Sequence, residues 1–331
     1  MKTRVILDVD TGSDDAIALM LAALHSSLDV IGCTTVLGNI PVKSCTENTI
    51  AVLDHVGRSD ISVFEGRSRQ IERNDFPIPR TPDDLASQFH KAKLPVRQSQ
   101  RSASTIGGVD FLIKTYLGNE SAPVLIAVAP LSNIAEAVRR QPSFASAVNK
   151  LVIMGGGSRH GNMTPFAEFN FWADPEAASI VFGAGFRDIL LVPLDATLQA
   201  LASEQDCVAL DNAGTDASIA VAAIIRQRLM SPNNPRKDGT AIHDALAVAA
   251  VIDETLVSAC PAFVSIETED PTQVGRSIVR TDLSDGTVAN CRIAIKPDRA
   301  RFVRLLNETL SQETGAARSG SKRPEIDRVF R

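Results

Sequence analysis

Short apolar runs alternate with helix-forming stretches along most of this 331-residue chain, and this alternation limits the folds open to it. Strands are predicted at 5–9, 30–36, 61–64, 124–129, 151–154, 189–194 and 263–266. Helices are predicted at 14–24, 41–56, 132–140, 175–182, 217–230, 244–252 and 298–310. Continuous apolar strands are typical of a parallel sheet that helices cover on both sides. The pattern predicts an α/β fold, a Rossmann-like, doubly wound, mostly parallel sheet with helices on both faces.

No shift in composition marks a second domain, so we expect a single domain over 1–314 and a polar C-terminal tail over 315–331. Two polar stretches rich in turn formers, 67–101 and 231–240, interrupt the strand–helix pattern. Long irregular segments in a compact domain are often functional loops, and surface insertions are the simpler alternative.

Charge and cysteine usage narrow the class of protein. The formal net charge of −5 disfavours a nucleic-acid surface. Four basic residues near a pocket loop could favour a more anionic ligand, and solvent-exposed charge is the simpler interpretation; they are Arg226, Arg228, Arg236 and Lys237. The chain has five cysteines, an odd number, which argues against a framework of paired disulfides and favours a protein of a reducing compartment. The first apolar run ends at Asp8, which is too short for a signal-peptide core, and no run could span a membrane. We therefore expect a cytoplasmic protein with neither nucleic-acid nor membrane partners.

Four carboxylates, those of Asp8, Asp10, Asp14 and Asp15, fall within eight positions at the end of the first predicted strand. In open α/β sheets, ligands bind beyond such strand ends. Helix capping with Ser13 as the cap explains Asp14 and Asp15, but it does not explain why two more like charges lie beside them. A bound cation would relieve the repulsion, and an all-oxygen set of ligands favours Ca²⁺ or Mg²⁺.

The same run partly matches the haloacid-dehalogenase type of phosphatase, whose signature is an apolar strand followed by Asp-x-Asp-x-Thr or Asp-x-Asp-Gly-Thr. In that hypothesis Asp8 is the nucleophile, Asp10 is the acid/base and Mg²⁺ is the cofactor. The acidic run alone leaves a phosphatase and another metal-dependent enzyme about equally supported.

Four further segments separate the two hypotheses: Val36-Leu37-Gly38-Asn39, Ala129-Pro130-Leu131-Ser132-Asn133, the stretch 161–176 with Asn162, Glu168 and Asn170, and His243-Asp244. Together with 10–15 they resemble the inosine-uridine-preferring nucleoside hydrolase family, in order, from residue 4 to about 310. A phosphatase predicts none of the last three segments.

The resemblance implies hydrolysis of the N-glycosidic bond of a small-molecule ribonucleoside to ribose and free base, with Ca²⁺ as cofactor, in a homodimer or homotetramer. It implies calcium ligands at Asp10, Asp15, Asp244 and the main-chain carbonyl of Val128. It implies contacts to the ribose from Asp14, Asn39, Met154, Asn162, Glu168 and Asn170. In the mechanism it suggests, Asp10 is the general base on a calcium-bound water, and His243 protonates or hydrogen-bonds to the departing base.

Departures from the family pattern concern the nucleobase. Many members carry His-Gly-x-x-Gly-Leu-Gly after the third strand, whereas the histidine nearest that point here, His90, has no glycines after it. Many members also have a tyrosine shortly before the His-Asp pair, but Tyr116 is the only tyrosine of this chain. Base preference is therefore left open. A calcium-dependent ribose-binding protein without turnover is the non-enzymatic alternative, and the presence of Asp10 and His243 argues against it.

Overall fold

The computed structural model describes residues 2–73, 89–90, 93–118, 122–232, 234, 236 and 238–312. The predicted domain boundary at 314, the tail, and much of the predicted loop over 67–101 lie outside these residues. Among the described residues, no helix has both the length and the apolar content needed to cross a bilayer.

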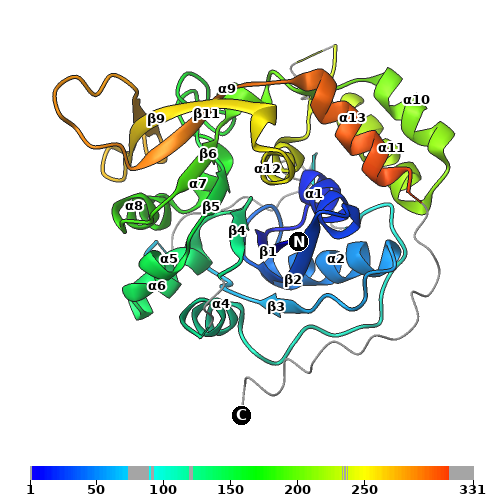
Figure 1. Cartoon of the computed structure of the whole chain (residues 1–331), viewed down its shortest axis with the longest axis horizontal. Helices are drawn as coiled ribbons and strands as arrows, with labels where there is room; N and C mark the ends of the chain where they lie inside the picture. The colour runs from blue at the N-terminus through cyan, green and yellow to red at the C-terminus, as the bar shows by residue number, and fades with distance from the viewer. Residues whose placement is uncertain are drawn as a thin grey trace.

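A nine-stranded sheet in the order β10-β9-β11-β6-β5-β4-β1-β2-β3 forms the centre of the molecule (Figure 1). Its strands are β1 (Thr3–Val9), β2 (Leu28–Thr35), β3 (Val63–Glu65), β4 (Val124–Ala127), β5 (Leu151–Met154), β6 (Ile189–Val192), β9 (Val257–Ile266), β10 (Ser277–Arg280) and β11 (Cys291–Pro297). The run β3-β2-β1-β4-β5-β6 is parallel and has the doubly wound order, with its switch point between β1 and β4. β11 extends it in parallel, β9 pairs with β11 in the antiparallel direction, and β10 pairs with β9 in the antiparallel direction. A separate two-stranded sheet pairs β7 (Leu201–Ala202) with β8 (Thr240–Ala241).

Helices cover both faces of the sheet (Figure 1). One layer contains α1 (Ser13–Leu24), α2 (Val42–His55), α11 (Asp216–Leu229), α12 (His243–Ile252) and α13 (Arg299–Leu310). The other contains α4 (Gly108–Leu117), α5 (Ser132–Arg140), α6 (Ser143–Ala147) and α8 (Pro175–Gly183). The remaining helices are α7 (Phe169–Ala173), α9 (Leu194–Thr197), α10 (Glu204–Ala213) and the 3₁₀ turn η1 (Glu254–Leu256).

Strand β1 shows how two cores arise from one sheet. Its alternate residues Val5, Leu7 and Val9 belong to the core under α1 and α12, whereas Ile6 belongs to the core under α4 and α5. Side chains on a strand alternate between faces, so a strand that is covered on both sides must be apolar at nearly every position. This explains the apolar run over residues 5–7 at the centre of β1.

The predicted fold class is confirmed, and the differences lie at the edges of the sheet. The predicted strand at 263–266 is the end of the longer β9. The strands β7, β8, β10 and β11 and the helices α4, α6, α7, α9 and α10 were not predicted. Residues of β9 alternate between buried and exposed, and α10 buries little of its surface, so neither has the continuous apolar pattern used for prediction. Asp174 caps α8, because its carboxylate accepts the Ala177 N–H at 3.1 Å and Pro175 follows as the first helical residue.

Candidate active site

A cavity of about 410 Å³ lies at the carboxyl-terminal ends of β4 and β5 and at the first turns of α1 and α12. All but two of the predicted site residues line it, namely Asp14, Asn39, Val128, Met154, Asn162, Glu168, Asn170, His243 and Asp244. The other two, Asp10 and Asp15, are fully buried and reach the cavity wall through Asn39. The topology thus brings segments that are far apart in sequence to one crevice, of a size suited to a small molecule.

The turn between β1 and α1 is held together by its own carboxylates. Asp15 accepts the backbone N–H groups of Asp10 at 3.1 Å and Gly12 at 3.0 Å, and Asn39 Nδ2 at 3.2 Å. The N-cap of α1 is Gly12, so the expectation that Ser13 caps this helix was wrong. Ser13 is already the first helical residue because Asp15 satisfies the free N–H groups of the turn.

The two carboxylate oxygens of Asp10 differ in their hydrogen bonding. Its Oδ2 accepts the Asn39 N–H at 2.5 Å, while its Oδ1 is buried and has no hydrogen-bond partner among the described residues. A buried carboxylate oxygen that lacks a donor is costly. The arrangement leaves Oδ1 available to a cation or to a water molecule.

Burial and mutual repulsion raise the pKa values of the buried carboxylates around this turn. Burial raises the pKa of Asp10 well above its usual value, and the charge of Asp15 raises it further. Burial and then Asp14 raise the pKa of Asp15 to about 6. Burial, followed by the charges of Asp14, Asp15 and Asp10, also raises the pKa of Asp244 well above normal. A divalent cation would offset this repulsion, and carboxylate oxygens suit a hard ion.

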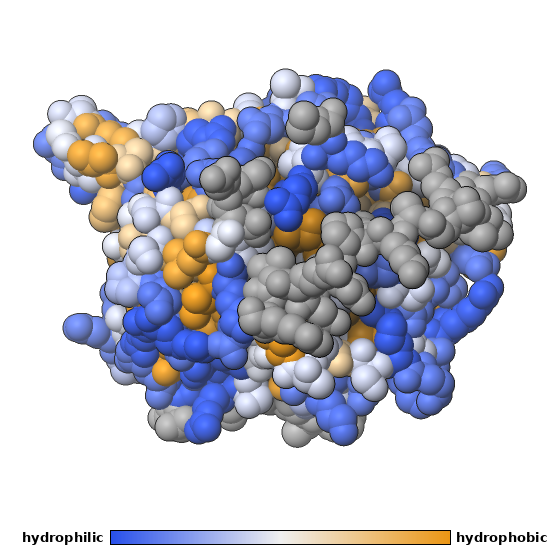
Figure 2. All heavy atoms as spheres, turned by 60° about the horizontal axis from the view of Figure 1, so that its bottom comes forward, coloured by the Kyte–Doolittle hydropathy of each residue, from blue (hydrophilic) through white to orange (hydrophobic). Residues whose placement is uncertain are grey.

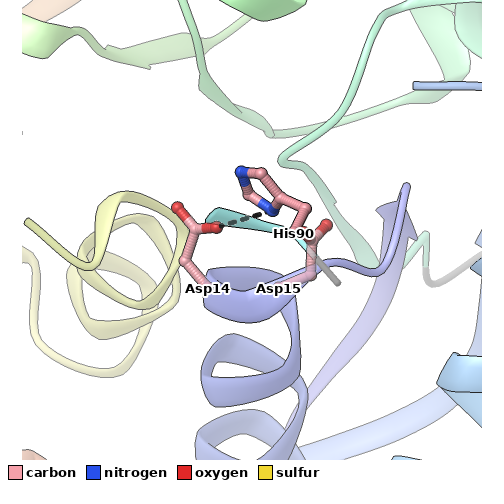
Figure 3. A group of neighbouring side chains, drawn as sticks. All are labelled: Asp14, Asp15 and His90. Carbon is pink, nitrogen blue, oxygen red and sulfur yellow. Dashed lines mark ion pairs between the residues drawn. The ribbon is translucent and has the colours of Figure 1, made fainter. Parts of the chain in front are cut away.

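His90 is a residue of the cavity to which the sequence assigned no role. Its Nδ1 lies 3.7 Å from Asp14 Oδ1 and accepts the Ser13 N–H at 3.2 Å, above the first turn of α1 (Figure 3). Ligand atoms of Asp14, Asp15 and His90 lie within 4.8 Å of one another. This group shares Asp15 with the predicted calcium ligands but includes a ring nitrogen, which suits softer metals than calcium.

Gly12 provides the space for that histidine. A Cβ atom at position 12 would lie 2.1 Å from His90 Nδ1. The sequence offered this single indirect signal, a glycine in the acidic turn, and it did not reveal which side chain fills the space.

Glu168, Asn170 and Asn162 form the polar wall that follows β5. Glu168 caps α7 and accepts the N–H groups of Gly156 at 2.8 Å and Asn170 at 3.0 Å. Burial raises its pKa to about 7 in spite of these bonds. Asn170 Nδ2 donates to the carbonyl of Met154 at 3.1 Å, and Asn162 Oδ1 accepts the Phe169 N–H at 2.9 Å. Hydrogen bonds therefore fix the orientation of these side chains before any ligand arrives.

The residues that follow β4 and open α12 complete the wall. The Val128 carbonyl lies 3.3 Å from Asn170 Nδ2 at the cavity surface. His243 Nδ1 shares a hydrogen bond of 2.7 Å with Thr197 Oγ1. Burial lowers the pKa of His243 to about 4, so its ring is neutral at neutral pH.

Arg228 on α11 is buried against the cavity, with 5% of its surface exposed, so its interpretation as solvent-exposed charge was wrong. It donates to Ser13 Oγ at 2.6 Å and to Asp14 Oδ1 at 3.3 Å. Burial acts to raise the pKa of Asp14, but the charge of Arg228, followed by the smaller electrostatic effects of His90 and His243, outweighs burial and holds that pKa below its usual value. Arg236, by contrast, is exposed as expected.

Asp8 does not face the cavity. Thr34 Oγ1 donates to its carboxylate at 2.5 Å and Asn133 Nδ2 donates at 2.8 Å, which ties it to α5 on the opposite face of the sheet. Burial raises its pKa to about 6. A phosphatase nucleophile must reach the ligand, and this geometry does not place Asp8 where it could.

Comparison with known proteins agrees with the ordered motifs. The family model described as inosine-uridine preferring nucleoside hydrolase matches residues 5–304. The non-specific ribonucleoside hydrolase RihC of Shigella sonnei is 32% identical over 94% of this chain and 99% of its own length. The pyrimidine-specific ribonucleoside hydrolase RihB of Escherichia coli is 30% identical over 93% and 96%. Among solved structures, the purine-preferring ribonucleoside hydrolase from Gardnerella vaginalis has a TM-score of 0.84 at 28% identity, covering 93% of this chain and 98% of its own.

Proposed function

The chain belongs to the inosine-uridine preferring nucleoside hydrolase family and hydrolyses ribonucleosides to ribose and free base, and we propose that it does so with a calcium-bound water activated by Asp10. The observation that carries this proposal is the Asp10 carboxylate. One of its oxygens is buried and has no partner among the described residues, beside two more carboxylates and a cavity lined by hydroxyl-binding groups.

The donor set fits calcium. Asp10, Asp15 and Asp244 offer carboxylate oxygens and Val128 offers a main-chain carbonyl, and hard cations prefer oxygen ligands. Calcium, when bound, would hold a water molecule, lower its pKa and offset the repulsion among the three carboxylates. The alternative group that includes His90 supports this ion less well, because His90 would contribute nitrogen.

The residues of the polar wall would bind the sugar. Ribose hydroxyls both donate and accept hydrogen bonds, and the carboxylates and carboxamides of Asp14, Asn39, Asn162, Glu168 and Asn170 can pair with them. Met154 would pack beside the ring. Preorganised negative charge at this end of the cavity favours the oxocarbenium-like transition state of glycosidic cleavage.

Asp10 would act as the general base. Its Oδ2 is fixed by the Asn39 N–H, so the free Oδ1 has a defined position from which to take a proton from water. The water oxygen forms a bond to the anomeric carbon as the bond from that carbon to the base nitrogen breaks. The electron pair leaves with the base, which finally gains the proton that the water lost. His243, held by Thr197, would hydrogen-bond to the departing base.

We also propose that the protein works in the cytoplasm as a homodimer or homotetramer. Figure 2 shows apolar side chains gathered on the protruding end of the sheet around β9, β10 and β11. The exposed large apolar residues of this region are Ile278, Val288 and Ile295, and such patches commonly form subunit contacts. Light scattering coupled to size-exclusion chromatography tests the oligomeric state.

The experiment that tests the function is release of reducing sugar from purine and pyrimidine ribonucleosides, with calcium and with chelator, beside 4-nitrophenyl phosphate. The panel must include both base classes because the relatives named above differ in base preference. We expect calcium-dependent release of ribose and no release of phosphate. Phosphate release without ribose release would contradict the proposal and revive the phosphatase.

Replacing Gly38 with alanine should lower kcat/KM about 10²-fold with little change in the folded structure. The new Cβ would lie 1.9 Å from Asp10 Oδ2 and 2.7 Å from Asp10 Cβ, so the carboxylate must move and lose the Asn39 N–H. The matched control is Gly183→Ala, where a Cβ meets nothing within 4 Å. Steady-state kinetics and circular dichroism of both variants give the answer, and unchanged kinetics of Gly38→Ala would argue against a fixed role for Asp10.

A further inference from the structure

Arg228 is a buried cation on a helix whose neighbouring arginine is solvated. Two residues earlier, Arg226 pairs with Glu204 and Asp211 on the outer side of α11. Arg228 instead lies against the cavity with 5% of its surface exposed. Moving a guanidinium out of water costs free energy unless its N–H groups are hydrogen-bonded, so the burial of Arg228 calls for an explanation.

The protein provides hydrogen-bond acceptors for only some of the N–H groups of the Arg228 guanidinium. Nη1 donates to Ser13 Oγ at 2.6 Å and to Asp14 Oδ1 at 3.3 Å, and Nη2 donates to the Ala241 carbonyl at 3.0 Å. Nε has no hydrogen-bond partner among the described residues. The ring of Phe89 lies over the guanidinium, 5.3 Å from Cζ to the ring centre, which is a cation–π contact.

Asp14 links Arg228 to the sugar end of the cavity. Asp14 lies in the proposed ribose-binding set, and Arg228 contacts it directly. Phe89 and Ala241 of β8 contact Arg228 and line the same cavity, and Asn234 and Arg236 line it as well. A ribose bound by Asp14 and by the wall after β5 would therefore direct its base toward Arg228.

Tyr116 cannot assist the base from its position. It is 2% exposed and packs edge-on against Phe144 in the core under α4, and it does not line the cavity. No tyrosine is among the described residues that line the cavity. The leaving base must therefore be helped by a different side chain.

We propose that Arg228 binds the nucleobase and stabilises the negative charge that develops on it as the glycosidic bond breaks, an inference that rests on the proposed ribohydrolase function. The electron pair of the broken bond moves onto the base nitrogen, and the guanidinium donates hydrogen bonds to the base edge while the charge is present. Arg228 acts only as a hydrogen-bond donor in this step and transfers no proton. The base then takes up the proton lost by the attacking water.

This role of Arg228 implies that the substrate carries a neutral base with a hydrogen-bond acceptor on the edge that faces Arg228. Electrostatic stabilisation by one preorganised donor is typically worth about 10²–10³-fold in rate. The competing explanation is that Arg228 only positions Asp14 on the ribose. The two explanations differ for a substrate whose leaving group needs no help.

The test compares inosine and uridine with 4-nitrophenyl riboside, whose nitrophenolate departs as a stable anion. For Arg228→Gln we expect kcat/KM to fall about 10²–10³-fold for the nucleosides and less than about tenfold for the nitrophenyl riboside. Arg228→Lys keeps the charge but loses the planar guanidinium. Its kcat/KM for the nucleosides should lie between the values of the wild type and the glutamine variant. Arg226→Gln on the same helix is the matched control and should leave both substrates unchanged.

Equal losses on both substrates would assign Arg228 to positioning Asp14 and overturn the proposal, as would no loss on either. The lysine variant decides the question if the glutamine variant does not fold. Failure of the underlying function is separately visible, because the wild type would then not cleave 4-nitrophenyl riboside in a calcium-dependent way.

Discussion

Replacing Asp10 with asparagine is expected to lower kcat/KM for ribonucleosides about 10²–10⁴-fold, which is the range that general-base catalysis usually contributes. The carboxamide is close in shape to the carboxylate, so packing around β1 should survive. It cannot take a proton from water, and it removes a charged oxygen from the proposed calcium site. The buried Oδ1, which has no partner among the described residues, is the atom whose loss should matter. Steady-state kinetics with saturating calcium measure the effect.

Asp8→Asn is the matched control for this variant. Asp8 lies in β1, two residues before Asp10, is equally buried, and is bonded to Thr34 and Asn133 away from the cavity. We expect a lower melting temperature but a loss of less than about tenfold in kcat/KM, because the two hydrogen bonds to Asp8 contribute stability rather than chemistry. If Asp8→Asn abolished activity while Asp10→Asn retained it, the assignment of the general base would be wrong.

The central sheet could be predicted from the sequence because its physical cause is local. Strands such as β5, with every residue buried, must be apolar throughout, and this leaves an unmistakable run of apolar residues. The paired strands β9 and β10 are close in sequence but partly solvated, so neither strand is a continuous apolar run and the pattern used for prediction does not reveal them in full.

The candidate site was predictable for the same reason, but only in part. Its residues follow strands or open helices, and the doubly wound order brings those points to one crevice. Arg228 was misjudged because a cation on a mixed helix is usually solvated, and its partner Asp14 is 214 residues away. His90 was missed because a glycine in another segment, Gly12, provides its space. Both contacts are products of tertiary structure.

Removing divalent cations with a chelator should reduce ribonucleoside hydrolysis by about 10³-fold or more, and calcium should restore it. Free water has a pKa near 16, and a metal-bound water can be several units more acidic, so loss of the ion removes most of the nucleophile. Magnesium should restore activity less well because it demands a smaller, octahedral site and gives up its waters reluctantly. The assay is reducing-sugar release at fixed pH with graded calcium and magnesium. Full activity in chelator would contradict the calcium proposal.

The same ion should raise the melting temperature, and more so at pH 7.5 than at pH 5.5. Without metal, burial and repulsion raise the pKa of Asp15 to about 6 and those of Asp10 and Asp244 well above normal. The metal-free folded state therefore binds protons more tightly than the unfolded chain does, and it gains stability as the pH falls toward and below 6.

Calcium requires the same carboxylates in their charged form, so protons compete with it and the stabilisation it provides shrinks over that range. At a hundredfold excess over Kd, calcium should stabilise the fold by about 2.7 kcal/mol at the higher pH. Thermal melts of the wild type and of Asp244→Asn, with and without calcium at both pH values, test this. The variant should lose most of the gain, and a gain independent of both pH and Asp244 would mean that calcium binds at other residues.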